Sequence, residues 1–220
     1  MKRKPHQAVH HIPPPSDGRR ARRRAETRAR ILRAALDLFA KQGYSSTTVE
    51  QITDAADVGK GTFFNYFPSK EYVMAGFGEM QLAKVEHALE GALRARRPTR
   101  AVWRHLAHEL AREPGRGPSL VRGLLVANLS SESVSKHMLR NLGRGREFLA
   151  QLIASGQQRG ELRNDLNPAE VARVFQQTFF GALLLWALDP TVELGSWLDK
   201  TFDLFWSAVA APSAPGEVRL

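Results

Sequence analysis

The 220-residue sequence contains no cysteine. It can therefore form neither disulfide bonds nor thiolate metal sites. Long apolar runs are also lacking: the longest, residues 179–188, is far shorter than the roughly 20 residues that a membrane-spanning helix requires. No apolar stretch follows the charged amino terminus, so we expect no secretory signal and no membrane partner. The chain is predicted to be a soluble, cytoplasmic protein.

Catalytic and cofactor motifs are missing as well. The sequence has no G-x-x-x-x-G-K-[ST] phosphate loop and no G-x-S-x-G nucleophile elbow. His105, His108 and Glu109 lie close together, but they do not match the H-E-x-x-H zinc pattern and no third ligand is indicated. We interpret them as solvated or partly buried side chains. The sequence therefore predicts a protein that is not an enzyme and that has no catalytic residue, cofactor or metal.

Strand signals are absent, because no two-residue alternation of apolar and polar residues is bounded by hairpin turns. Apolar residues recur instead at spacings of three and four, which is typical of amphipathic helices. A chain of this length can bury a sizeable core. The sequence thus predicts an all-α protein of about nine helices.

The segment from Thr47 to Lys70 predicts two short helices joined by a tight turn. Thr48 can cap the first helix, and Gln51, three residues later, completes a T-x-x-Q capping box. Gly59 is expected to supply the unusual backbone angles of the turn. The second helix covers residues 60–67 and ends before a proline, because the residue preceding proline avoids helical conformation.

Two short helices across a turn suit DNA binding, since the second can enter the major groove while the first crosses the backbone. Phe63 and Phe67 are four residues apart and are predicted to pack inward. The other residues offer a cation, hydroxyls, an amide and an aromatic ring, which can contact phosphates, base edges and thymine methyls. The predicted DNA-facing set is Lys60, Gly61, Thr62, Phe64, Asn65 and Tyr66. The alternative is an aromatic surface helix that contacts another protein.

The run from Arg28 to Lys70 resembles the DNA-binding domain of the tetracycline-repressor (TetR) family of bacterial regulators. The resemblance rests on LFAKQGY at the end of the first helix, on the helix that starts with threonine, and on GTFFNYFPSK. It implies a homodimeric repressor or activator whose larger C-terminal domain binds a small effector. By position, it also implies that Thr48 and Lys70 contact phosphates and that the second short helix faces the DNA.

The sequence departs from the family pattern at two positions. Serine is common in the family where Gly59 stands, so the cap of the second short helix is weaker here. Tyrosine is common where Phe64 stands. The missing hydroxyl removes one of the phosphate contacts that the resemblance would otherwise imply.

Positive charge is concentrated near the amino terminus. The formal net charge is +10, and residues 1–30 carry ten Lys or Arg against Asp17 and Glu26. The prolines and arginines there predict a disordered basic arm over residues 1–24. We expect its arginines, including Arg24, to contact the DNA backbone or a minor groove. A merely solvated charged tail is the alternative.

Three further regions follow from the helical pattern. The DNA-binding domain is predicted at residues 25–70, an effector-binding and dimerisation domain at residues 71–211, and a flexible tail at residues 212–220. Ser69 is expected to cap a long helix over residues 70–96, which would connect the two domains rigidly. Asn167 is expected to cap the eighth helix, whose second half is apolar almost all round.

The last two helices are predicted to form the homodimer interface, as the resemblance implies. The predicted interface residues are Phe179, Leu183, Trp186, Trp197, Phe202 and Phe205. The alternative is that these side chains form a core within one chain. An effector pocket is expected between the fourth and eighth helices, lined by Phe77, Met80, Trp103, Leu106, Asn128, Phe175, Gln176 and Phe179.

These observations favour a ligand-responsive transcriptional regulator. We expect a repressor that binds double-stranded, palindromic DNA as a homodimer and is released by a small, mainly apolar effector. One alternative is a constitutive architectural DNA-binding protein, and another is a helical protein-interaction module. A large specificity ratio for one DNA site would distinguish the regulator from both.

Overall fold

The computed structural model describes residues 16–212. Within this range, an isolated bridge between Leu162 and Ala210 is the only β pairing. The predicted all-α architecture is confirmed. The described residues form α1 (Ser16–Gln42), α2 (Val49–Ala56), α3 (Lys60–Tyr66), α4 (Lys70–Ala95), α5 (Thr99–Ala111), the 3-10 turn η1 (Pro114–Arg116), α6 (Pro118–Ser130), α7 (Glu132–Gln158), α8 (Pro168–Leu188) and α9 (Leu194–Val209).

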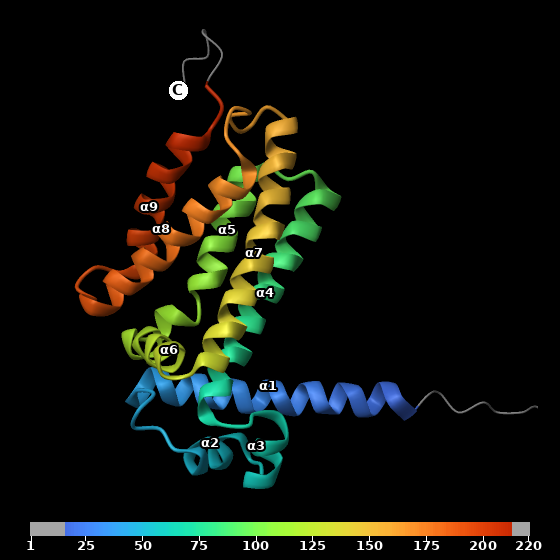
Figure 1. Cartoon of the computed structure of the whole chain (residues 1–220), viewed down its shortest axis with the longest axis vertical. Helices are drawn as coiled ribbons and strands as arrows, with labels where there is room; N and C mark the ends of the chain where they lie inside the picture. The colour runs from blue at the N-terminus through green and yellow to red at the C-terminus, as the bar shows by residue number, and fades with distance from the viewer. Residues whose placement is uncertain (1–15, 213–220) are drawn as a thin grey trace, which may run out of the picture.

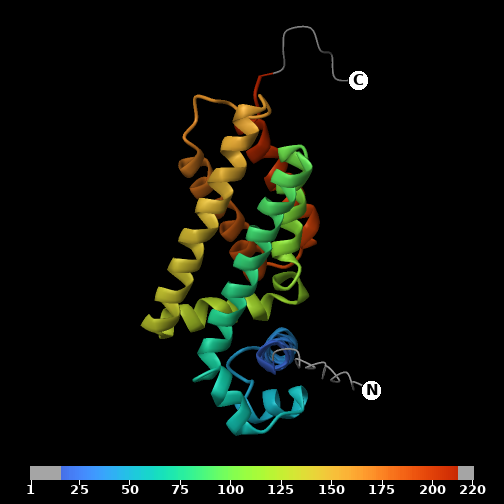
Figure 2. The same cartoon turned by 90° about the vertical axis from the view of Figure 1, so that its right-hand side faces the viewer.

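The molecule has a small base and a larger helical body (Figure 1). Helix α1 lies across the base, and α2 and α3 lie beneath it. Helix α4 rises from the base into the body, where it runs beside α7 (Figure 2). Helices α5, α8 and α9 complete the body, so α3 lies at the opposite end of the molecule from the C-terminal end of α9.

Helix α1 begins at Ser16, well before the predicted start at Ala25. The prediction of disorder is therefore wrong for residues 16–24, which are helical. Arginine and alanine both have high helix propensity, and the Nε atom of Arg22 lies 3.4 Å from Oε1 of Glu26 one turn later. Residues 1–15 of the predicted arm and residues 213–220 of the predicted tail lie outside the described residues.

The capping box of α2 is confirmed. The Thr48 hydroxyl accepts a hydrogen bond from the Gln51 backbone N–H at 3.2 Å, and the Gln51 side-chain oxygen accepts one from the Thr48 N–H at 2.9 Å. The turn that follows differs from the prediction. Asp57 has the positive φ, 49°, whereas Gly59 is extended with φ −73°. Aspartate can occupy this region because its short polar side chain can hydrogen-bond locally.

Two longer helices begin at the predicted residues. The Asn167 side chain accepts hydrogen bonds from the backbone N–H groups of Ala169 and Glu170, at 2.9 and 3.4 Å, so the predicted cap of α8 is confirmed. Ser69 occupies the N-cap position of α4, but its hydroxyl bonds to the Glu71 carboxylate and not to a backbone N–H. The predicted cap of α4 therefore has a different partner.

Two main buried clusters hold the fold together. One joins the base to the body: Phe63 and Phe67 from the base pack in the same cluster as Met74 of α4 and Leu120 of α6. The other fills the body around Trp103, which is completely buried. Since the first cluster contains residues of α4 and α6, the base is anchored to the body through both helices.

Helix α8 is long and apolar enough, by length and composition alone, to cross a membrane: it has 21 residues, with an 18-residue window of mean hydropathy 1.3. Core helices of soluble proteins pass the same test. In this fold α8 packs against α6, α7 and α9, and Phe175, Phe179 and Trp186 are buried. Packing within the helical body thus accounts for one side of α8, and 44% of the apolar window is buried.

Candidate DNA-binding surface and effector chamber

Helix α3 divides into an inner and an outer face, as the sequence predicts. Phe63 and Phe67 are buried, and their ring centroids lie 5.9 Å apart. Phe64 is 51% exposed and Asn65 is also exposed. A Cβ atom on Gly61 would meet no atom within 4 Å, so packing within the chain does not require a glycine there. The outer face therefore offers an amide, an aromatic ring and an open backbone to solvent.

The positive charge at the start of α3 is already paired. The Nζ atom of Lys60 lies 2.5 Å from Oε1 of Glu50 on α2, and both side chains are more than half exposed. The hydrogen bond and charge of Lys60 hold the pKa of the Glu50 carboxyl below its usual range. A phosphate that approaches Lys60 must compete with Glu50, which is the nearest carboxylate on α2.

Two further predicted DNA contacts lie on exposed surface. The Thr48 hydroxyl accepts one hydrogen bond from Gln51, which leaves its own hydrogen able to donate to a phosphate. Arg24 is exposed on α1. Figure 1 shows that this part of α1 projects beyond the rest of the base.

Lys70 lies at the junction between the base and α4. Its Nζ atom donates to the carbonyl oxygens of Tyr44 and Thr47, at 2.8 and 2.9 Å, and lies 4.4 Å from the centroid of the Tyr44 ring. Two of the three ammonium donors are therefore used within the protein. This arrangement fastens the loop after α1 to the start of α4, and it leaves Lys70 poorly placed for its predicted phosphate contact.

Glu71 joins the same junction. The Tyr44 hydroxyl donates to its carboxylate at 2.9 Å, and the Ser69 hydroxyl also bonds to it. Burial alone would raise the pKa of Glu71, but these hydrogen bonds and the charge of Lys70 outweigh it and hold the pKa below the usual range. The carboxylate is therefore charged at neutral pH and strengthens the attachment of the base to α4.

Replacing Lys70 with methionine tests this junction. The change leaves the two carbonyl oxygens without their donor, so the free energy of unfolding should fall by about 2 kcal/mol in chemical denaturation. Lys136→Met is the matched control, because Lys136 is mostly exposed and pairs with Glu132 one turn away on the same helix. Its effect should stay within about 0.5 kcal/mol. Equal losses in the two variants would contradict the structural role of Lys70.

Helix α6 also contacts the base. A Cβ atom on Gly123 would lie 2.5 Å from Cβ of Tyr44, and a Cβ atom on Gly117 would lie 3.0 Å from the carbonyl oxygen of Ala40. A side chain at position 123 would clash with Tyr44, and one at position 117 would crowd Ala40. Helix α6 therefore packs directly against the base.

An apolar chamber lies between α4, α6, α7 and α8. Its inner part is a cavity of about 90 Å³, and its outer part is a groove of about 400 Å³. The two parts are contiguous because they share wall residues. The shared residues are Phe77, Pro114, Leu124, Met138, Phe180 and Leu183.

The chamber contains five of the eight predicted pocket residues: Phe77, Asn128, Phe175, Gln176 and Phe179. The other three predictions are corrected. Trp103 stands at the centre of the core, with its ring 5.1 Å from that of Phe205. Leu106 faces a different depression, between α4 and α5. Met80 packs against the buried cluster of the base.

Sequence reasoning missed the polar wall residues Gln81 and Asn141. Both line the inner cavity. A signal was present, because Gln81 is four residues after Phe77 and Asn141 is three residues after Met138. These spacings place an amide on the same helix face as an apolar wall residue.

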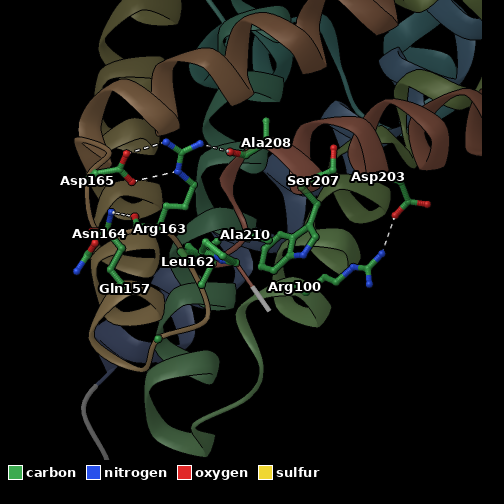
Figure 3. Close-up of a pocket in the computed structure, with 14 residues that line it drawn as sticks. Arg100, Gln157, Leu162, Arg163, Asn164, Asp165, Asp203, Ser207, Ala208 and Ala210 are labelled. Atoms are coloured by element: carbon green, nitrogen blue, oxygen red, sulfur yellow. Dashed lines mark hydrogen bonds and ion pairs between the residues drawn. The ribbon is translucent and has the colours of Figure 1, made fainter. Parts of the chain in front are cut away.

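Another depression lies between the end of α7 and α9 (Figure 3). These helix ends are at the opposite end of the molecule from α3 (Figure 1). Its charged groups are already paired. The Nη2 atom of Arg163 lies 2.6 Å from Oδ2 of Asp165, and that of Arg100 lies 3.0 Å from Oδ1 of Asp203. Since these charges are matched within the protein, we assign no ligand to this depression.

The predicted interface residues are mostly buried within one chain. Exposure is between 3 and 9% for Phe179, Leu183, Trp186, Phe202 and Phe205. This burial favours the alternative of an intrachain core for these five, because their side chains already pack between helices. Trp197 alone is partly exposed. The larger aromatic residues of α8 and α9 face inward, and smaller aliphatic residues cover the outside.

The outer faces of α8 and α9 carry exposed apolar side chains, which we call the outer apolar face. On α8, Val174, Leu185 and Leu188 are 48, 57 and 64% exposed. On α9, Leu204 is 74% exposed. The three α8 residues follow a helical spacing that places them along one side of the helix.

Sequence comparisons agree with this architecture. Residues 31–75 match the profile described as bacterial regulatory proteins, tetR family. Transcriptional regulator AcuR of Cereibacter sphaeroides is 31% identical over 169 residues, which cover 70% of this chain and 73% of AcuR. The HTH-type transcriptional regulator TcmR of Streptomyces glaucescens is 41% identical over 95 residues, or 37% of this chain. That match spans only 42% of TcmR.

A solved structure extends the similarity over both parts of the fold. The TetR-family transcriptional repressor FadR of Thermus thermophilus, in complex with lauroyl-CoA, is 29% identical and superposes with a TM-score of 0.62. The superposition covers 87% of this chain and 100% of FadR. The chain belongs to the tetR family of bacterial regulatory proteins and is a ligand-responsive, DNA-binding transcriptional regulator rather than an enzyme.

Proposed function

We propose that this regulator is a cytoplasmic repressor that binds a palindromic operator as a homodimer and is released by a mainly apolar effector in the chamber. One observation most strongly supports a coupling between effector binding and DNA binding. Helix α4 carries both Met74, which packs in the buried cluster of the base, and Phe77 and Gln81, which line the chamber. A shift of α4 caused by a ligand would therefore move the base directly.

We infer that the DNA-reading surface is the outer face of α3 together with the start of α2. The proposed contacts are Thr48, Lys60, Gly61, Thr62, Phe64, Asn65 and Tyr66. Five of them, Thr48, Lys60, Gly61, Phe64 and Asn65, are exposed, whereas Thr62 and Tyr66 are half-buried and Tyr66 also packs against the buried cluster of the base. The set offers a mixture of donor, acceptor and apolar groups. Lys70 is left out, because its ammonium group is held by two backbone carbonyls.

The outer apolar face is our proposal for the dimer interface. Val174, Leu185, Leu188 and Leu204 are exposed in one chain, and an unpaired set of large apolar side chains is typical of a surface that binds a partner. A two-fold axis through this face would set the two copies of α3 side by side on one DNA duplex. Two such helices read half-sites about 34 to 36 Å apart.

Selection of short DNA duplexes from a random pool by the full-length protein tests the proposed operator symmetry. The proposal predicts a two-fold symmetric consensus with half-sites separated by about one helical turn or a multiple of it. Recovery of only asymmetric or unrelated sequences would contradict it. Light scattering of the recovered complexes should show at least two chains per duplex.

The arginine-rich start of α1 is proposed to contact the DNA backbone. Changing the five arginines of this helical extension to glutamine preserves helix propensity and removes five positive charges. The slope of log affinity against log salt should become shallower by up to about 9, because each of the two chains of the homodimer loses five charges. The changed residues are Arg19, Arg20, Arg22, Arg23 and Arg24.

A matched control uses exposed arginines far from the base. Arg94 and Arg96 lie at the C-terminal end of α4. Changing both to glutamine should leave the salt dependence of operator binding unaltered. An unaltered slope in the five-arginine variant as well would show that the extension is a solvated charged surface and not a DNA contact.

A further inference from the structure

The chamber has an uncharged lining. Among the described residues that form its two parts, every side chain is apolar or neutral and polar. Arg146 reaches the lining only indirectly, by donating to Oε1 of Gln176 at 3.2 Å. A carboxylate or phosphate that entered this space would lose its hydration without gaining a counter-charge, which strongly disfavours its binding.

Three buried polar atoms in the walls have no hydrogen-bond partner within residues 16–212: Nδ2 of Asn141, Oε1 of Gln81 and Oδ1 of Asn128. Two of these amides have a defined orientation. The Nε2 atom of Gln81 donates to the Leu110 carbonyl at 2.6 Å, and Nδ2 of Asn128 donates to the Leu124 carbonyl at 2.8 Å. The oxygens of both are therefore left as acceptors, and Asn141 supplies a donor.

The packing of α4 against α7 brings the Asn141 amide close to Gly78, and both residues line the inner cavity. A Cβ atom on Gly78 would lie 3.2 Å from Nδ2 of Asn141 and 3.9 Å from Sδ of Met138. Buried polar groups in proteins are nearly always paired. A donor and two acceptors that remain unpaired in the walls of an otherwise apolar chamber therefore indicate where the polar group of a ligand belongs.

We infer that the chamber binds an uncharged amphiphile: an apolar body with a neutral head group that both accepts and donates a hydrogen bond, such as a primary amide or an alcohol. The head group accepts from Asn141 and donates to Gln81, which both line the inner cavity. The apolar body fills the groove between α6 and α8. A ligand that brings a carboxylate or phosphate into the chamber is disfavoured, because such a charge finds no partner in the lining. This inference rests on the proposed function only in treating the ligand as the effector.

Isothermal titration calorimetry of the full-length protein at pH 8 tests this ligand class. The probes are decanamide and decanoate, which share one acyl chain length and differ in the charge of the head. Decanamide should bind at least about thirtyfold more tightly than decanoate, because the carboxylate finds no counter-charge in the lining. Equal or tighter binding of decanoate, or no saturable binding of decanamide, would overturn the inference.

A variant isolates the polar contact. Asn141→Leu should weaken decanamide binding about tenfold, because the ligand oxygen loses its donor. Gln151→Leu is the control on the same helix, at an exposed position, and should bind as the wild type does. Circular dichroism melting confirms that both variants fold. Unchanged decanamide affinity in the Asn141→Leu variant would contradict the proposed contact between Asn141 and the head group.

The same samples show whether a negative result contradicts the proposed ligand class or the proposed function. Operator affinity is measured separately, with and without saturating decanamide. Tight decanamide binding that leaves operator affinity unchanged would support the ligand class and contradict release by a ligand in the chamber. Failure of decanamide to bind, with normal operator binding, would instead contradict the ligand class and leave the DNA-binding proposal intact.

Discussion

Replacing Asn65 with alanine weakens binding to the selected operator about a hundredfold, while binding to unrelated DNA stays the same. Asn65 is exposed on the outer face of α3, where its amide can donate to and accept from one base edge. Each half-site loses roughly 1 to 3 kcal/mol of discrimination, and a dimer loses it twice. The free energy of unfolding should stay within about 0.5 kcal/mol, because no buried group changes.

Fluorescence anisotropy with labelled operator and scrambled duplexes measures both affinities. Asn164→Ala is the control, since Asn164 is an exposed asparagine in the loop between α7 and α8, away from the base. It should bind both duplexes as the wild type does. Equal weakening of the two duplexes by Asn65→Ala would mean that Asn65 contacts the backbone and does not read sequence.

Replacing Leu185 with glutamate should dissociate the homodimer. Leu185 is 57% exposed on α8, so a charge there is tolerated in one chain but is buried without a partner when two outer apolar faces meet. Two such charges per dimer should raise the dimer dissociation constant at least about a hundredfold. Sedimentation velocity at micromolar concentration should then show monomers. Operator affinity should also fall, because a monomer brings only one copy of α3 to the DNA.

Leu129→Glu is the control, because it places the same charge at an exposed leucine outside the proposed interface. Leu129 lies near the end of α6 and is 87% exposed, outside the outer apolar face. This variant should remain dimeric and bind the operator normally. A dimeric Leu185→Glu protein would show that the interface lies elsewhere, and Trp197, which is partly exposed on α9, would then be the next position to change.

Features that depend on neighbouring residues in the sequence could be predicted. The capping box of Thr48 and Gln51 and the Asn167 cap of α8 each involve residues within three positions of one another. The inward positions of Phe63 and Phe67 follow from their spacing of four. Such contacts are set by the local geometry of a helix, whatever the rest of the chain does.

Features that depend on the packing of distant helices could not be predicted. Helix α8 is apolar on nearly every side, so the sequence does not indicate that Phe179 faces the core and Leu185 faces outward. Asn141 on α7 lies close to Gly78 on α4, and only the fold shows that both residues line a cavity. The positive φ of Asp57 was missed because glycine is the residue that most often adopts it.

The ratio of operator affinity to scrambled-duplex affinity at physiological salt tests the central claim most directly. A regulator that reads sequence through α3 should prefer its selected operator at least about a thousandfold over a scrambled duplex of the same length and composition. A ratio below about tenfold would contradict the claim, because binding would then come from the general attraction of positive charge to the backbone. The chain would in that case be an architectural DNA-binding protein.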